Sequence, residues 1–179
     1  RFGPKGAAVD HDLRIGTNPT EINGPHGLAV SPDGRYYFVT TAHGVPTGGM
    51  WKFSTVGDSL LGRVTLGNFP ATVQVTPNGA YAMTVNFNLH GDMVPSSVSV
   101  VWTEGMVEIA RVQTCVMPHG SRLNPQGTKH YSACMMNDAL VEIDTKDFKV
   151  SRHFMLSKGS EHGMAGPVGG MAMSHDLTC

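Results

Sequence analysis

The sequence has 179 residues and a formal net charge of -1, from 13 Lys and Arg against 14 Asp and Glu. This length suits one domain with a stable core, and the near-neutral charge argues against a protein that binds nucleic acid or an anionic membrane surface. No run of about 18 apolar residues occurs, so we expect no membrane-spanning helix. The 22 Gly and 11 Pro favour turns and short strands over long helices.

Three similar segments follow one another along the chain. They begin at Pro25, Pro70 and Pro118, so their spacings are 45 and 48 residues. In each segment the proline opens a short alternating strand, and a turn and a β-rich strand with aromatic residues come next. The turns share a Pro-x-Gly pattern, which supplies the negative and then positive φ of a tight turn. These turns are Pro32-Asp33-Gly34, Pro77-Asn78-Gly79 and Pro125-Gln126-Gly127.

The rest of each segment predicts two further strands. They fall at residues 49–53 and 61–66, 98–102 and 106–112, and 140–144 and 149–155. Four strands in each repeat match the size of one blade of a β-propeller. Strands this short cannot bury both faces alone, so neighbouring units must stack.

We therefore predict an all-β fold, a β-propeller of four-stranded antiparallel blades that is incomplete in this chain. A closed ring typically has about four to eight blades, and this chain holds three units and a fragment. The blades are expected at residues 25–69, 70–117 and 118–156. Residues 1–24 would hold the last strand of a preceding blade, at 8–16, and a connector. Residues 157–179 would be a Gly/Met-rich segment that leads to a further blade.

The repeats resemble those of the YVTN family of β-propellers. The best matches are Pro25-His26-Gly27 with Ser31-Pro32-Asp33-Gly34, and Val141-Glu142-Ile143-Asp144-Thr145. The resemblance covers residues 25–156. It implies the fold but says almost nothing about function, because propellers carry many unrelated activities.

Histidines are the main indication of chemistry. His26 and His119 occupy the same repeat position, at the start of the innermost strand, which places both near the central channel. Neutral imidazoles that converge there could bind copper or zinc. The second repeat has Ala71 at this position, and His162 and His175 are candidates to extend the ring. The alternative is that these histidines hydrogen-bond to backbone in turns.

The resemblance leaves both interpretations open. Pro-His-Gly is common in YVTN repeats without metal, whereas the propeller of nitrous oxide reductases holds a copper cluster with channel histidines. We expect His43 and His90 to lie in loops. His11, His130 and His153 are expected at exposed strand positions.

Three cysteines leave at least one unpaired within the chain. Cys115 and Cys134 could form a disulfide, act as thiolate ligands or remain buried free thiols, and Cys179 could pair with another segment or chain. No Cys-x-x-Cys pattern occurs, which argues against haem attachment and structural zinc.

Methionines are concentrated in the C-terminal segment. Met164, Met171 and Met173 could be soft copper ligands, but methionine more often forms adaptable contact surfaces. A segment with so many glycines needs a compensating contact to be ordered. We therefore expect residues 157–179 to pack against another chain or across the open end of the blades, with these three methionines as anchors.

The sequence contains no nucleophile elbow, phosphate-binding loop or dinucleotide fingerprint. We therefore expect a non-enzymatic propeller without a cofactor, acting as a protein-binding or scaffold subunit in the periplasm or outside the cell. Its partners would be other protein subunits, as in a larger membrane-associated or redox complex. The alternative is a copper-dependent periplasmic redox or electron-transfer protein with His26, His119, His162 and His175 as ligands.

Overall fold

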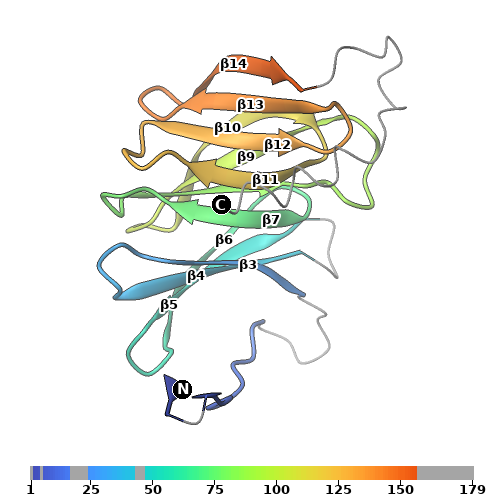
Figure 1. The fold of residues 1–179 in the computed structure, drawn as a ribbon. Coiled ribbons are helices and arrows are strands. Elements are labelled where there is room, and N and C mark those ends of the chain that lie inside the picture. Colours follow the sequence, from blue (N-terminus) through green and yellow to red (C-terminus); the bar gives the residue numbers. More distant parts are fainter. Residues whose placement is uncertain (1, 5, 17–23, 43–46, 157–179) are drawn as a thin grey trace.

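The structure is a computed structural model that describes residues 2–4, 6–16, 24–42 and 47–156 (Figure 1). These residues form three four-stranded antiparallel sheets and one two-stranded sheet. Figure 1 shows the three larger sheets following one another through the molecule, in chain order. The predicted all-β class and the four-stranded units are therefore confirmed. Within these residues, no helix is long and apolar enough to cross a membrane.

Each four-stranded sheet consists of strands that are consecutive in the chain, and we call the sheets blades 1, 2 and 3. Blade 1 contains β3 (Pro25–Val30), β4 (Tyr36–Thr41), β5 (Gly49–Ser54) and β6 (Leu60–Thr65). Blade 2 contains β7 (Pro70–Val75), β8 (Tyr81–Asn86), β9 (Pro95–Trp102) and β10 (Val107–Val116). Blade 3 contains β11 (Pro118–Leu123), β12 (Lys129–Cys134), β13 (Ala139–Asp144) and β14 (Lys149–Met155).

The turns between the first two strands of each blade form as their sequences predict. Ser31 donates a hydrogen bond to Asp33 at 2.6 Å, and Thr76 donates one to Asn78 at 2.7 Å. The third residue of each Pro-x-Gly motif has a positive φ, between 68° and 73°. Glycine adopts this conformation without steric cost, which is why it stands there.

The core lies between the blades. Phe38 and Met50 of blade 1 form one buried cluster with Ala82 and Val101 of blade 2. A second cluster joins blades 2 and 3 and includes Met83, Val100, Val141 and Ile143. Both faces of blade 2 are thus covered by neighbours, which explains why its strands carry so many apolar residues.

The N-terminal segment differs from the expected strand at residues 8–16. The strands there are β1 (Phe2–Gly3) and β2 (Gly6–Ala7), which pair with each other, and residues 8–16 have no regular secondary structure. These residues form no strand because their backbone does not pair with a strand of a neighbouring sheet. Instead, Ile15 packs against a cluster that contains Trp51 and Phe53 on blade 1.

Candidate functional site

The two repeat-equivalent histidines meet at the start of the innermost strands. The ring centroids of His26 on β3 and His119 on β11 are 5.6 Å apart, with an interplanar angle of 79°. Blade 2 lies between these two blades, and its equivalent residue is the fully buried Ala71. Because alanine has no ring at this position, the two imidazoles can approach each other across blade 2.

Aromatic rings surround this histidine pair. The buried Phe69 lies 5.4 Å from His26 and 5.6 Å from Phe87, and Phe87 lies 4.7 Å from His119, all between ring centroids. His90 also contacts Phe69, at 6.1 Å. These edge-to-face contacts fix the orientation of the two imidazoles. His90 follows β8 outside any strand, as expected for a loop residue.

Within the described ranges, no group of three or more His, Cys, Asp and Glu residues could hold a metal ion. A metal at the channel would therefore have two histidine ligands, His26 and His119, from this part of the chain. The other sequence candidates at residues 43, 162, 164, 171, 173, 175 and 179 lie outside the described residues.

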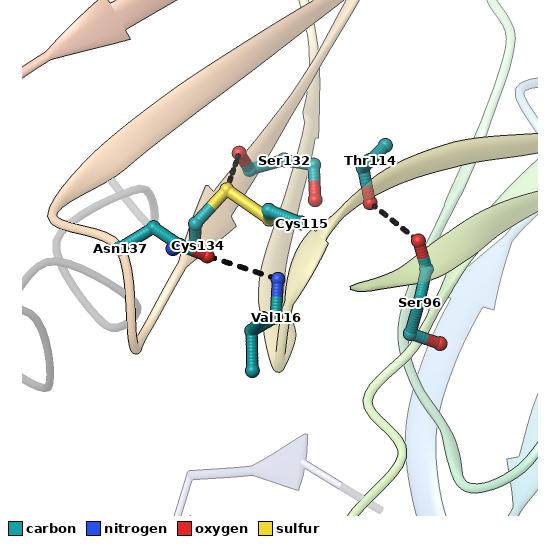
Figure 2. Close-up of a disulfide and its surroundings, with 7 residues drawn as sticks. All are labelled: Ser96, Thr114, Cys115, Val116, Ser132, Cys134 and Asn137. Carbon is teal, nitrogen blue, oxygen red and sulfur yellow. Dashed lines mark hydrogen bonds between the residues drawn. A yellow bond between two sulfur atoms is a disulfide. The ribbon is translucent and has the colours of Figure 1, made fainter. Parts of the chain in front are cut away.

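A disulfide joins two blades (Figure 2). Cys115 at the end of β10 and Cys134 at the end of β12 are bonded, with their Cα atoms 5.9 Å apart. This is one of the three alternatives that the sequence left open, and it removes both thiols as metal ligands. The neighbouring amide of Val116 donates a hydrogen bond of 3.0 Å to the side chain of Asn137, which adds a second link between blades 2 and 3.

His130, which was expected at an exposed strand position, is completely buried. His130 pairs with Ile143 in the register of β12 and β13, and Ile143 belongs to the core between blades 2 and 3. Its Nε2 lies 2.6 Å from the hydroxyl of Ser121. Burial lowers the pKa of His130 to about 3. The ring is therefore neutral at physiological pH.

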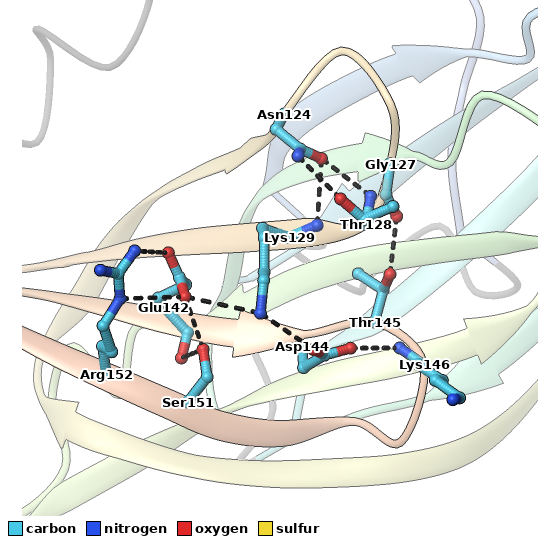
Figure 3. Close-up of polar contacts among 10 residues, drawn as sticks. All are labelled: Asn124, Gly127, Thr128, Lys129, Glu142, Asp144, Thr145, Lys146, Ser151 and Arg152. Carbon is cyan, nitrogen blue, oxygen red and sulfur yellow. Dashed lines mark hydrogen bonds and ion pairs between the residues drawn. The ribbon is translucent and has the colours of Figure 1, made fainter.

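The opposite face of blade 3 carries a network of charges (Figure 3). Residues that pair directly across strands share a face, so the register places one set of side chains on the side away from blade 2. We call this set the outward face of blade 3; it consists of Lys129, Tyr131, Ala133, Leu140, Glu142, Asp144, Arg152 and Phe154.

Glu142 is the centre of this network. Its side chain is 2% exposed, and its carboxylate accepts hydrogen bonds from Arg152 at 2.9 Å and from Ser151 at 2.7 Å. Lys129 lies 3.6 Å from the same carboxylate and 2.9 Å from Asp144. The hydrogen bonds from Arg152 and Ser151 lower the pKa of Glu142 to about 2. Arg152 itself remains 63% exposed.

The role of Glu142 was not predicted from the sequence. The residue was noticed only within the Val-Glu-Ile-Asp pattern of a propeller strand. The register makes Glu142 equivalent to Lys52 in blade 1 and Val100 in blade 2. The signal that could have indicated this role is a repeat position with an apolar residue in blade 2 and charged residues in blades 1 and 3.

Comparisons with known proteins support the fold. No family model matches the chain, and no curated protein matches it. A solved structure of Kuenenia stuttgartiensis hydrazine synthase is similar, with 26% identity, a TM-score of 0.65, and coverage of 79% of this chain and 39% of that chain.

Other similar structures have lower identity. A functionally unknown protein from Desulfotomaculum acetoxidans DSM 771 has 10% identity and a TM-score of 0.62, with 74% of this chain and 43% of that chain covered. The RRP9 WD40 repeats have 10% identity and a TM-score of 0.63, with 75% and 39% covered. The chain thus spans about two fifths of each of these structures. The neighbours include proteins of the β-propeller and WD40 type.

Proposed function

We propose that this chain is a propeller segment that binds other protein subunits in a larger assembly and contributes no catalytic groups of its own. The observation that carries the proposal is the outward face of blade 3. Its counterparts in blades 1 and 2 include Phe38 and Met83, which are buried against the next blade. On blade 3 the same face carries Tyr131 and the exposed Arg152. The outward face of blade 3 is thus equivalent to faces that pack against a neighbouring blade, but it carries polar and charged groups. Such a face suits a protein partner with complementary polar groups.

The similarity to hydrazine synthase supports a more specific form of this proposal. The 26% identity with that chain exceeds the 10% identity of the other propellers, although the TM-scores are close. We infer that the assembly is a multi-subunit enzyme related to hydrazine synthase. The repeats themselves would be of the YVTN type, on the strength of Pro25-His26-Gly27 and the turn that follows it.

The location outside the cytoplasm is part of the same proposal. Disulfides persist in the periplasm and in extracellular spaces and are rare in reducing compartments. The Cys115–Cys134 bond therefore favours a periplasmic or extracellular protein.

The proposal is tested on the native assembly. The chain carrying Arg152→Ala, with Arg14→Ala at the opposite end of the molecule as the matched control, is expressed with a tag in its own organism. We expect Arg152→Ala to reduce the amount of co-purified partner subunits about tenfold and the control to leave it unchanged. Formation of hydrazine by the purified assembly would support the proposal that it is related to hydrazine synthase. Normal recovery of partners by a correctly folded Arg152→Ala chain would overturn the role of the outward face.

Contact between His26 and His119 favours a second candidate, a copper-dependent redox or electron-transfer protein. The ring centroids of the two imidazoles are 5.6 Å apart, and imidazole is a ligand type that suits copper. The test is copper content of the purified protein by elemental analysis. Stoichiometric copper that is lost in a His26→Phe/His119→Phe variant and kept in His11→Phe would support this candidate. Absence of copper from protein loaded with Cu⁺ would exclude it.

A further inference from the structure

A pocket of about 580 Å³ lies between blades 1 and 2. Three turns line it: residues 31–35, residues 77–80 and residues 102–104. The rings of Tyr36, Phe38 and Trp102 form part of its wall. This volume is in the range of roughly 300–1,000 Å³ that is typical of small-molecule sites.

Lys52 on β5 lines this pocket, although it stands at a repeat position that belongs to the interface between blades. It is 9% exposed, whereas its equivalent in blade 2 is the fully buried Val100. Its ammonium donates a hydrogen bond of 3.0 Å to the carbonyl of Thr103 and lies 4.2 Å from the centroid of the Tyr36 ring. Burial lowers the pKa of Lys52.

Burial lowers the pKa of Lys52, and the charges of Glu104 and Asp33 offset this effect only in part. Asp33 accepts hydrogen bonds from the Arg35 side chain at 2.6 Å and from Ser31 at 2.6 Å. These contacts lower the pKa of Asp33 and keep it ionised. Glu104 lies at the exposed rim, and within the part of the chain that the structure describes it forms no ion pair with Lys52.

A buried ammonium without a bonded carboxylate is costly for the fold, because burial removes its hydration. A hydrophobic residue such as Val100 fills the equivalent position without this cost. The cost is offset if an anion from solution completes the site. The two remaining features of the pocket, its aromatic walls and its acidic rim, restrict the kind of anion.

We propose that this pocket binds a small organic carboxylate, with the carboxylate at Lys52 and an apolar body against Tyr36 and Trp102. A singly charged anion matches the single ammonium of Lys52, whose burial the charges of Glu104 and Asp33 offset only in part. Asp33 and Glu104 at the rim repel a phosphate dianion more strongly than a singly charged carboxylate. The site lies at the interface of blades 1 and 2, so it is independent of the proposed partner-binding face on blade 3.

The proposal is tested by calorimetric titration of the 179-residue chain with benzoate, benzamide and inorganic phosphate. Benzoate carries the charge and the flat apolar body, benzamide keeps the shape without the charge, and phosphate keeps only the charge. We expect saturable binding of benzoate at millimolar concentration or below, and binding of benzamide and phosphate at least tenfold weaker. Equal binding of benzoate and benzamide would overturn the role of the ammonium.

Variants make the test specific. Lys52→Met keeps the side-chain length and removes the charge, and Lys149→Met removes a charge that is 78% exposed on β14. We expect Lys52→Met to weaken benzoate binding at least tenfold and Lys149→Met to leave it unchanged. Lys52→Gln serves as a second variant if Lys52→Met does not fold, as judged by thermal melting. The proposal would be overturned if the wild-type chain showed no binding of benzoate at concentrations up to about 10 mM.

Discussion

One repeat position carries three different residues in the three blades. Lys52, Val100 and Glu142 are equivalent in register, and all three are buried. Val100 contributes to an apolar interface, Lys52 reaches the backbone of the next blade, and Glu142 is held by charged neighbours on its own blade. A single position therefore determines whether a blade face is apolar, cationic or part of an ionic network.

Glu142 makes stability depend on acid pH. Its pKa is lowered from 4.5 to about 2 by Arg152 and Ser151, so the folded state prefers the ionised carboxylate. This contribution to stability is complete above pH 4.5 and is lost as the pH falls from 4.5 towards 2. We expect Glu142→Gln to be less stable than the wild type at pH 6 and to lose less stability between pH 4.5 and 2. Urea unfolding at several pH values measures this, and equal slopes for both proteins would contradict it.

His130 acts in a higher pH range. Burial lowers its pKa from 6.5 to about 3, so unfolding exposes a ring that takes up a proton. Its contribution to stability is complete above pH 6.5 and is lost as the pH falls from 6.5 towards 3, with a slope of about 1.4 kcal/mol per pH unit. We expect His130→Gln to remove this slope between pH 6.5 and 4.5. The exposed His153→Gln is the control, and an unchanged slope in His130→Gln would refute the assignment.

At the scale of the elements, the repeat was predictable because every blade contains the same type of turn between its first two strands. Pro32, Asp33 and Gly34 require a tight turn, and the same requirement recurs twice with a nearly constant spacing. The direction in which each strand residue points was less predictable. In an ordinary half-buried sheet, alternation distinguishes a core face from a solvent face. His130 lies on the face of blade 3 that packs against blade 2, and which face of a blade is buried depends on how the blades stack, so alternation alone could not place it.

The distances between residues of different blades could not be predicted from the sequence either. Cys115 and Cys134 belong to different blades, and their distance depends on how the blades stack rather than on local propensity. The shared repeat position of His26 and His119 predicted that both lie near the channel, but their direct contact depends on the alanine in the intervening blade. The segment at residues 8–16 was predicted as a strand, but strand formation requires a partner that the sequence alone does not supply.

The disulfide stabilises the junction of blades 2 and 3. Its cysteines are 19 residues apart, and closing a loop of this length stabilises a fold by about 3 kcal/mol. We expect the Cys115→Ala/Cys134→Ala variant to lose about this amount in chemical unfolding. Cys179→Ala is the control. No difference between oxidised and reduced wild-type protein would show that the bond adds nothing.

Gly27 stabilises the junction of blades 1 and 2 by its lack of a side chain. A Cβ atom there would collide with the backbone carbonyl of Ala71 and lie 2.8 Å from the hydroxyl of Thr40. The same hydroxyl accepts a hydrogen bond from the Gly27 amide and donates one to the carbonyl of Ala71. We expect Gly27→Ala to cost roughly 1–3 kcal/mol, measured by urea unfolding. A variant as stable as the wild type would show that the backbone around Gly27 and Ala71 shifts to accept the Cβ atom without cost.

At the scale of the whole molecule, three blades share two buried interfaces, and the end faces differ in character. The N-terminal segment covers an aromatic cluster on blade 1 through Ile15. Blade 3 ends on the charged outward face and on β14, the last strand of its sheet. The edge of β14 and the outward face form a continuous surface, on which Arg152 is the most exposed charge of the Glu142 network.

Hydrogen–deuterium exchange of the chain, alone and within its native assembly, tests the central claim most directly. If a partner subunit binds the outward face of blade 3, the amides of β12 to β14 will exchange more slowly in the assembly, while those of the turn at residues 31–35 will not change. Identical exchange of β12 to β14 in both states, in an assembly that retains this chain, would contradict the account.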